Sequence, residues 1–195
     1  MKKKIFFIFF IFNIFTYSGN ALEPDVFVQS TVNRASMLLS ENISKEEKIL
    51  KLKQIAKDTV DINGIGFYTL GSVRKELSEE NKLKYLELFE KYFLKSFSSR
   101  LSEYTDPKIN VISAEVINDK YTIVSSVLEA DEKRPEIKID WRVYTINPEK
   151  LLVRDLIIEG LSLARTQREE FSSVIQNGNG NIEVLFSNLR KFLEN

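Results

Sequence analysis

The sequence predicts an α+β fold, with N-terminal and C-terminal helices packed on a curved, mainly antiparallel four-stranded sheet that encloses an apolar pocket. Apolar residues recur at three- and four-residue steps before residue 105 and again after residue 160, as in amphipathic helices. Between residues 107 and 159 apolar residues alternate with polar ones, as in half-buried strands. Short separators rich in Asn, Asp and Pro divide this middle part and favour hairpin connections.

Residues 1–21 have the composition of a Sec-type signal peptide. Lysines at positions 2–4 precede residues 5–15, which are apolar except for one asparagine. Small residues ending at Ala21 match the site that a signal peptidase reads. We expect cleavage after Ala21 and one domain over residues 22–195. The apolar run is too short to span a bilayer, which takes about 20 apolar residues.

Composition excludes several classes of function. Without the three signal lysines, the 28 basic residues fall to 25 against 28 acidic ones, a net charge of −3. Such a chain has no general electrostatic attraction to nucleic acid or to an anionic bilayer. The chain has no cysteine and no histidine, which excludes disulfides, thiol nucleophiles, histidine-assisted catalysis and histidine-based metal sites. We expect a soluble protein of a Gram-negative periplasm, held together by its core alone.

Two amphipathic helices open the mature chain. The first is predicted at Pro24–Ser40, and the apolar residues of one face are Val28, Val32, Ala35 and Leu39. Ser44 is the expected N-cap of the second helix, and Glu47 three residues later completes a capping box. The apolar stripe of this second helix consists of Ile49, Leu52, Ile55 and Ala56.

A glycine-punctuated segment, residues 61–70, precedes the longest predicted helix. Gly64, Gly66 and Gly71 do not have the spacing of a dinucleotide-binding fingerprint, and no strand precedes them. We interpret them as positions where helices approach closely or end. Ser78 predicts the start of a helix that runs to about residue 104. Its aromatic stripe fits either an ordinary core or the wall of a cavity; its members are Tyr85, Leu86, Phe89, Tyr92, Phe93, Phe97, Leu101 and Tyr104.

Four strands are predicted at residues 108–118, 120–130, 136–147 and 151–159. The third alternates, with Ile137, Ile139, Trp141 and Val143 on one face and Lys138, Asp140 and Arg142 on the other. One face of the sheet is therefore expected to cover a core, and the other to meet water or charged partners. Gly160 ends the strands, and helices follow at residues 161–176 and 181–193.

The sequence contains no convincing catalytic constellation. Asp155 and Glu159 lie four residues apart in the last strand and are expected on one face, where paired carboxylates perform acid–base chemistry or bind a cation. Because Arg142 and Arg168 are available as partners, we interpret the group as an ion-pair network at the strand-to-helix corner. Ser162 lacks the second glycine of a nucleophile elbow and is better explained as a helix N-cap.

The C-terminal part of the chain carries a more specific pattern. It resembles the MlaC family, also called the toluene-tolerance family of periplasmic phospholipid-binding proteins. The residues that carry the resemblance are Asp155, Ile158, Glu159, Gly160, Ser162, Arg168 and Phe171. Three upstream segments, at residues 70–74, 78–81 and 139–143, also resemble family patterns. Val73 and Leu151 stand where the family usually has tryptophan.

The resemblance implies a phospholipid carrier that uses no cofactor. Such proteins shuttle lipid between an outer-membrane lipoprotein–porin complex and an inner-membrane ABC transporter with its MCE-domain partner, and so maintain outer-membrane lipid asymmetry. A protein sheath is physically needed because exposing an acyl chain to water costs about 0.8 kcal/mol per CH₂. The expected lipid-binding residues are Phe67, Leu70, Phe89, Phe93, Val127, Ile139, Trp141 and Ile158. The expected structural polar network consists of Arg74, Asp155, Glu159 and Arg168.

Two other classes of function stay open. One is a periplasmic enzyme, or a binding protein for a small apolar ligand, on the same scaffold. Polar groups clustered inside the pocket would indicate an enzyme, and Asp155 is the one candidate. The other class is an interaction module without a ligand, which a filled core without a cavity would indicate.

Overall fold

The computed structural model describes residues 22–132 and 134–194, and the predicted signal peptide lies outside these ranges. The helices are α1 (Pro24–Ser40), α2 (Lys45–Thr59), α3 (Ile62–Thr69), the 3-10 helix η1 (Val73–Lys75), α4 (Glu79–Leu101), α5 (Leu163–Asn177) and α6 (Ile182–Glu194). The strands are β1 (Ile109–Asn118), β2 (Tyr121–Leu128), β3 (Ile137–Tyr144), β4 (Leu152–Ile158) and β5 (Leu161–Ser162). Within the described residues, no helix is both long and apolar enough to cross a membrane.

The strands form one antiparallel sheet in the order β1-β2-β3-β4-β5, which confirms the predicted α+β class. The predicted count of four strands is wrong by one, because Leu161 and Ser162 pair with the end of β4. Glu159 and Gly160 have φ angles of +49° and +82°, and two such residues make a tight hairpin turn. Helix α5 therefore starts at Leu163, two residues later than predicted.

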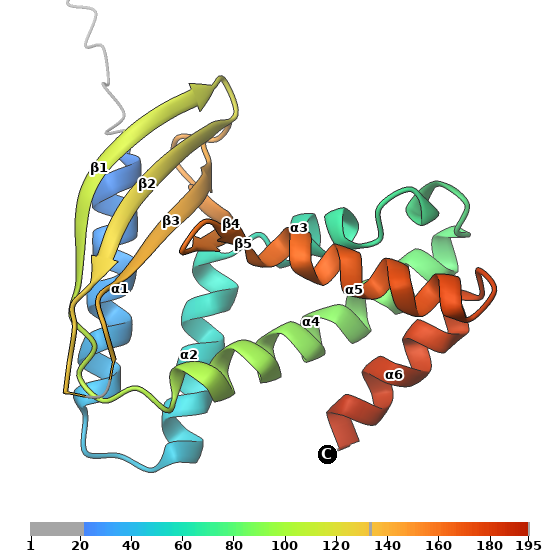
Figure 1. Cartoon of the computed structure of the whole chain (residues 1–195), viewed down its shortest axis with the longest axis horizontal. Coiled ribbons are helices and arrows are strands. Elements are labelled where there is room, and N and C mark those ends of the chain that lie inside the picture. The colour runs from blue at the N-terminus through green and yellow to red at the C-terminus, as the bar shows by residue number, and fades with distance from the viewer. Residues whose placement is uncertain (1–21, 133, 195) are drawn as a thin grey trace, which may run out of the picture.

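The curved sheet has an inner face, along which α1 lies (Figure 1). Val124, Val143 and Val153 of this face pack against Val28 and Val32 of α1, and we call these five residues the sheet core. The outer face carries the charged residues of β3 that the alternation predicts there; they are Lys138, Asp140 and Arg142. Along β3 the sheet is thus apolar on the inner face and charged on the outer one.

The register of β4 shifts at one residue. Val143 pairs with Val153, whereas Arg142 pairs with Asp155, so Arg154 is the extra residue of a β-bulge. The bulge moves Asp155 onto the outer-face register beside Arg142 and keeps Val153 on the inner face. As a result Arg154 and Asp155, which are consecutive polar residues, both avoid the sheet core.

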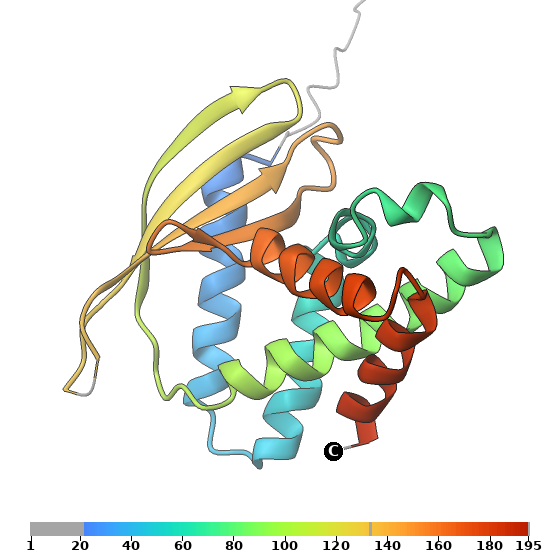
Figure 2. The same cartoon turned by 45° about the vertical axis from the view of Figure 1, so that its right-hand side comes forward.

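Helices α3 to α6 pack together beside the sheet (Figure 2). Tyr85 of α4 is fully buried at their centre, with the rings of Phe89, Phe171 and Phe186 at centroid distances of 5.7, 6.4 and 6.4 Å. We call Tyr85 and these three phenylalanines the helical core. The buried part of the predicted aromatic stripe is therefore ordinary core. Gly66 permits the close approach of α3, because a Cβ there would lie 2.9 Å from the ring of Phe89.

The segment between α2 and α3 joins the two cores. Val60 packs against both of them and forms a parallel bridge with Val153 of β4. The backbone N–H of Asp61 donates to the carbonyl of Val153 at 2.9 Å. The side chain of Asp61 caps α3 by accepting from the backbone N–H of Gly64 at 2.9 Å. The chain thus passes from α2 to α3 along the edge of the sheet core.

Three serine N-caps that the sequence predicts are confirmed. The hydroxyls of Ser44, Ser78 and Ser162 accept from the backbone N–H three residues later, at 3.1, 3.2 and 3.1 Å. Each satisfies one of the free backbone donors at the start of a helix, which is worth about 1 kcal/mol.

Candidate functional site

We call helices α3 to α6 and their connections the helical layer. The predicted lipid-binding residues of this layer divide between core and surface. Leu70 and Phe89 are each 1% exposed, and both belong to the same buried cluster as Tyr85. Phe93 is half-buried and lies 6.2 Å from Phe89, measured between ring centroids. Phe67 is half-buried and lines a surface cavity instead. Access of a ligand to Leu70 or Phe89 requires a movement of the helices.

The predicted lipid-binding residues of the sheet lie on two different faces. Ile139, Trp141 and Ile158 lie together on the inner face, where Ile139 pairs with Ile158 and Trp141 with Leu156. Val127 pairs with Lys138 on the outer face, so the structure does not bring it together with the other three. The sequence-based expectation grouped Val127 with the inner-face residues, and its position on the outer face corrects that grouping.

A hydroxyl on the inner face explains why the phase of β2 is hard to assign from sequence. Ser126 is fully buried, donates to the carbonyl of Ile139 at 3.1 Å and accepts from Trp141 Nε1 at 2.8 Å. Because both interactions are made inside the protein, a serine takes the inner position and Val127 takes the outer one. The same bonds fix the indole of Trp141, which is half-buried and packs against the sheet core.

The inner face includes apolar residues that the sequence analysis did not select. Leu156 is half-buried, pairs with Trp141 and packs against the sheet core. Val60 is also half-buried and lies where the sheet core meets the helical core. We call Val60, Trp141, Leu156 and Ile158 the apolar strip. Its signal in the sequence was the shared phase of Leu156 and Ile158; nothing local marked Val60.

Asp155 is the centre of the strand-to-helix corner. It is 4% exposed; one carboxylate oxygen accepts from Ser162 Oγ at 2.6 Å, and the other from the backbone N–H of Ala164 at 3.0 Å. The guanidinium of Arg142, its cross-strand neighbour, lies 3.6 Å away. These contacts satisfy the carboxylate and place its negative charge at the N-terminus of α5, where the helix dipole favours it.

The other three residues of the predicted polar network lie elsewhere. Glu159 is exposed in the turn after β4, and its carboxylate accepts from the backbone N–H of Lys138. Arg74 is exposed in η1, and Arg168 is half-buried on α5. Within the described residues, no hydrogen bond or ion pair connects these three to Asp155, so the structure does not assemble the network as one unit.

A different ion pair connects the helical layer to the sheet. Arg154, the bulge residue, donates to the carboxylate of Asp61 at 2.6 Å and to the hydroxyl of Tyr121 at 2.9 Å. Its guanidinium also stacks on the ring of Tyr144 at 3.6 Å. We call Arg154, Asp61, Tyr121 and Tyr144 the clamp. It is not predictable from local sequence, because it depends on the bulge at Arg154 and on a contact over 93 residues.

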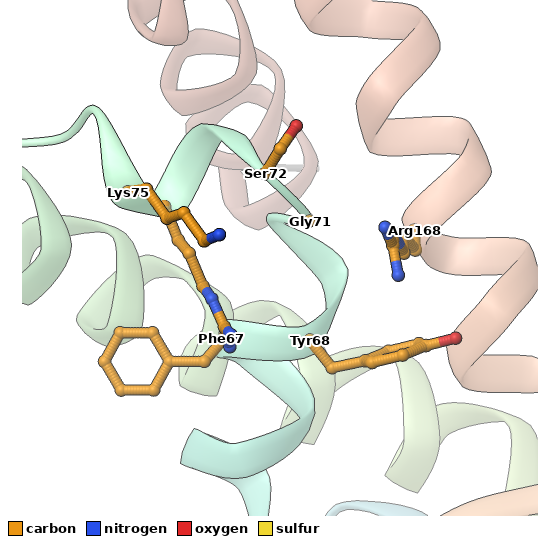
Figure 3. A pocket seen from close by; sticks show the side chains of 7 residues that line it. Phe67, Tyr68, Gly71, Ser72, Lys75 and Arg168 are labelled. Carbon is orange, nitrogen blue, oxygen red and sulfur yellow. The ribbon is translucent and has the colours of Figure 1, made fainter.

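A surface cavity of about 270 Å³ lies between α3, η1 and α5. Figure 3 shows Tyr68 and Arg168 approaching one another across it, while Phe67 points to the other side of α3. The Arg168 guanidinium carbon lies 5.2 Å from the centroid of the Tyr68 ring. The lining residues are Phe67, Tyr68, Gly71, Ser72, Arg74, Lys75 and Arg168.

Comparisons with known proteins agree with this architecture. The model of a family described as MlaC protein matches residues 29–191. Among solved structures, the phospholipid-binding protein from Ralstonia solanacearum in complex with a phospholipid has a TM-score of 0.75 and 16% sequence identity, over 89% of this chain and 98% of that one. At that identity the likeness concerns the fold. No curated protein matches the chain.

Proposed function

Because the chain belongs to the MlaC family, we propose that it is a phospholipid carrier whose acyl-chain site includes the apolar strip of the sheet's inner face. The observation that carries this proposal is the position of Trp141, Leu156 and Ile158. They are half-buried apolar residues on the inner face, beside the junction of the sheet core and the helical core. The fold shared with a protein that binds a phospholipid supports the same conclusion.

The carrier function accounts for an apolar strip that has no ionisable or nucleophilic side chain. Acyl chains gain about 25 cal/mol for each Å² of apolar surface removed from water, and this requires neither a nucleophile nor a metal. Asp155, the one candidate for catalysis, has both oxygens hydrogen-bonded to Ser162 and Ala164. Those bonds hold a strand-to-helix corner, which supports a structural role and a binding protein over an enzyme.

Binding of two acyl chains requires the helical layer and the sheet to separate. No strand residue lines the surface cavity between α3, η1 and α5, or a second surface cavity between α1 and α2. Val60 and the Asp61–Arg154 pair connect the two layers, so the chains would enter beside this connection. We propose that the apolar strip is covered by the helical layer in the lipid-free protein and by acyl chains in the loaded one.

The proposed wider role has two parts, namely export of the protein to the periplasm and transport of phospholipid between the two membranes. We propose that residues 1–21 direct export to the periplasm and are removed, leaving one domain over residues 22–195. The loaded protein then exchanges lipid with an outer-membrane lipoprotein–porin complex and an inner-membrane ABC transporter with its MCE-domain protein, and so maintains lipid asymmetry. The test is transfer of a fluorescent phospholipid from the loaded protein to vesicles that contain that transporter, compared with empty vesicles.

The single tryptophan of the chain provides a direct test of the acyl-chain site. Phospholipids brominated on their acyl chains quench tryptophan fluorescence on contact. We expect brominated lipid to quench Trp141, and the same lipid without bromine to leave the intensity unquenched. The matched control is the double variant Trp141→Phe/Val127→Trp, which moves the indole to the outer face and should escape quenching. Absence of quenching in the wild-type protein would contradict the proposed site.

A further inference from the structure

The cavity between α3, η1 and α5 is unusual in its charge. Arg74, Lys75 and Arg168 contribute three cationic side chains to its lining, and no carboxylate lines it. Among the described residues, no aspartate or glutamate forms an ion pair with any of the three. Three cations around one small cavity attract an anion, and their mutual repulsion makes the empty site less favourable.

Arg168 is held in place without a hydrogen-bonding partner. Its guanidinium stacks over the ring of Tyr68 at 5.2 Å and lies against Gly71, where a Cβ would be 3.1 Å from Nε. These contacts orient the planar group but leave its N–H donors free among the described residues. By contrast, the clamp arginine Arg154 donates to Asp61 and Tyr121. Oriented, unpaired guanidinium donors are the usual means of binding phosphate or carboxylate in a bidentate way.

We propose that this cavity is a binding site for a phosphate-type oxyanion, with Arg168 as its central donor and Arg74 and Lys75 as flanking cations. The volume of about 270 Å³ is below the usual range of small-molecule pockets, so it suits one charged group better than an acyl chain. The hydroxyl of Ser72, which also lines the cavity, is a further donor. The site is separate from the apolar strip, because the residues that line the cavity do not include any residue of the strip.

Two sources supply this chemistry, namely the head group of a carried phospholipid and free phosphate. Phe67 is compatible with the head-group source, because it lines the cavity and is also one of the expected lipid-binding residues. The site itself does not rest on the proposed carrier function, since inorganic phosphate tests it without any lipid. Failure of lipid transport would therefore leave the oxyanion site standing, and the reverse also holds.

The first experiment titrates the mature protein with inorganic phosphate, at constant ionic strength against chloride, and follows the NMR signals of the Arg168 Nε–H and the Gly71 amide. We expect saturable shifts that Arg168→Gln weakens at least about ten-fold, because charge-assisted hydrogen bonds are lost. Arg74→Gln/Lys75→Gln changes only exposed side chains and should weaken binding without loss of the fold. The control Lys150→Gln removes one exposed charge from the β3–β4 turn and should bind as wild type.

The second experiment compares phosphatidylglycerol with a diacylglycerol that has the same acyl chains. If the head group occupies the site, loading with phosphatidylglycerol abolishes the phosphate-induced shifts, and Arg168→Gln weakens retention of that lipid but not of diacylglycerol. If free phosphate is the ligand, the shifts persist in the loaded protein. Either result supports the oxyanion site. The proposal is overturned if wild type, Arg168→Gln and Arg74→Gln/Lys75→Gln are indistinguishable with both probes.

Discussion

The hydroxyl of Ser162 donates to the carboxylate of Asp155 at 2.6 Å and thereby ties the start of α5 to the end of the sheet. The same hydroxyl accepts from the backbone N–H of Arg165 at 3.1 Å, and the other oxygen of Asp155 accepts from the N–H of Ala164. Two side chains thus satisfy two free backbone donors of the helix. A buried aspartate is therefore explained by helix capping and does not require a ligand.

We predict that Asp155→Ala lowers the free energy of unfolding by about 2–3 kcal/mol, because hydrogen bonds to a buried charged group are lost and their donors are left unpaired. Urea unfolding followed by circular dichroism measures this change. Ser162→Ala removes one of the bonds and should cost less. Glu115→Ala, an exposed carboxylate of β1, is the control and should unfold as wild type. Equal stability of Asp155→Ala and Glu115→Ala would contradict the assigned role.

The sequence located helices α1, α2, α4, α5 and α6 and the four long strands, because periodicity and serine caps are local signals. It did not assign the short helix α3, which forms in the glycine-punctuated segment. It missed β5, which contains two residues and depends on the positive φ angles of Glu159 and Gly160. It also placed Asp155 and Glu159 on one face, whereas Glu159 lies in the turn. The adjacent polar residues Arg154 and Asp155 were the available sign of a bulge, because a regular strand points neighbours to opposite faces.

The candidate site was harder to predict than the fold. Inner-face residues such as Trp141 follow from strand phase, but Val127 does not, since the inner position beside it is filled by Ser126 with both hydrogen bonds made internally. The prediction of one structural polar network was wrong for a related reason. Arg168 was expected as a partner of Asp155 in an ion-pair network at the strand-to-helix corner, whereas its position on α5 directs it to Tyr68 and Gly71. Contacts between distant segments decide such positions.

We predict that Trp141→Asp abolishes phospholipid binding and that Val127→Asp retains it. The first places a charge in the apolar strip, where burial without a partner is costly, and the second places it on the outer face. Co-purified lipid, measured by mass spectrometry of the mature protein isolated without detergent, gives the readout. Phe93→Asp, in the helical layer, should also abolish binding. Retention of lipid by folded Trp141→Asp would contradict the acyl-chain site.

We predict that Arg168→Ala lowers the melting temperature, because the cation–π contact with Tyr68 and the packing of the side-chain stem are lost. The contact is worth about 0.5–1 kcal/mol at a half-exposed site. Thermal unfolding of the phosphate-free protein measures the change, with Lys150→Ala as the control for loss of one charge. An unchanged melting temperature would show that Arg168 contributes nothing to stability.

Gly71→Ala should destabilise the protein by about 1–2 kcal/mol, since a residue with a Cβ is strained at its φ of +59°. The new Cβ would also lie 3.1 Å from Arg168 Nε. In the Arg168→Ala background only the backbone strain remains, so the two changes should be non-additive by about 0.5 kcal/mol or more. Gly180→Ala is the matched control, with a φ of +82° and open space around the added Cβ. Full additivity of Gly71→Ala with Arg168→Ala would argue against the contact.

Alkaline pH should destabilise the helical core through Tyr85. Burial raises the pKa of the Tyr85 hydroxyl, because it disfavours the charged phenolate. Burial also raises the pKa of Tyr92. Because the folded pKa of Tyr85 lies above the unfolded value of about 10, its contribution to stability is complete below pH 10 and is lost as the pH rises through the folded value.

We therefore predict that the free energy of unfolding falls steeply above pH 10, by up to about 1.4 kcal/mol per pH unit for Tyr85. Tyr85→Phe should flatten this fall while costing about 1 kcal/mol at pH 7, because its hydroxyl lies 2.7 Å from Thr69 Oγ1. Thr69 Oγ1 already donates to the carbonyl of Gly66 at 2.8 Å, so it accepts from Tyr85. Thr69→Val removes the same bond but keeps the titrating group, so it should lose stability at pH 7 and retain the steep alkaline fall. Parallel pH profiles for wild type and Tyr85→Phe would mean that other groups control alkaline unfolding.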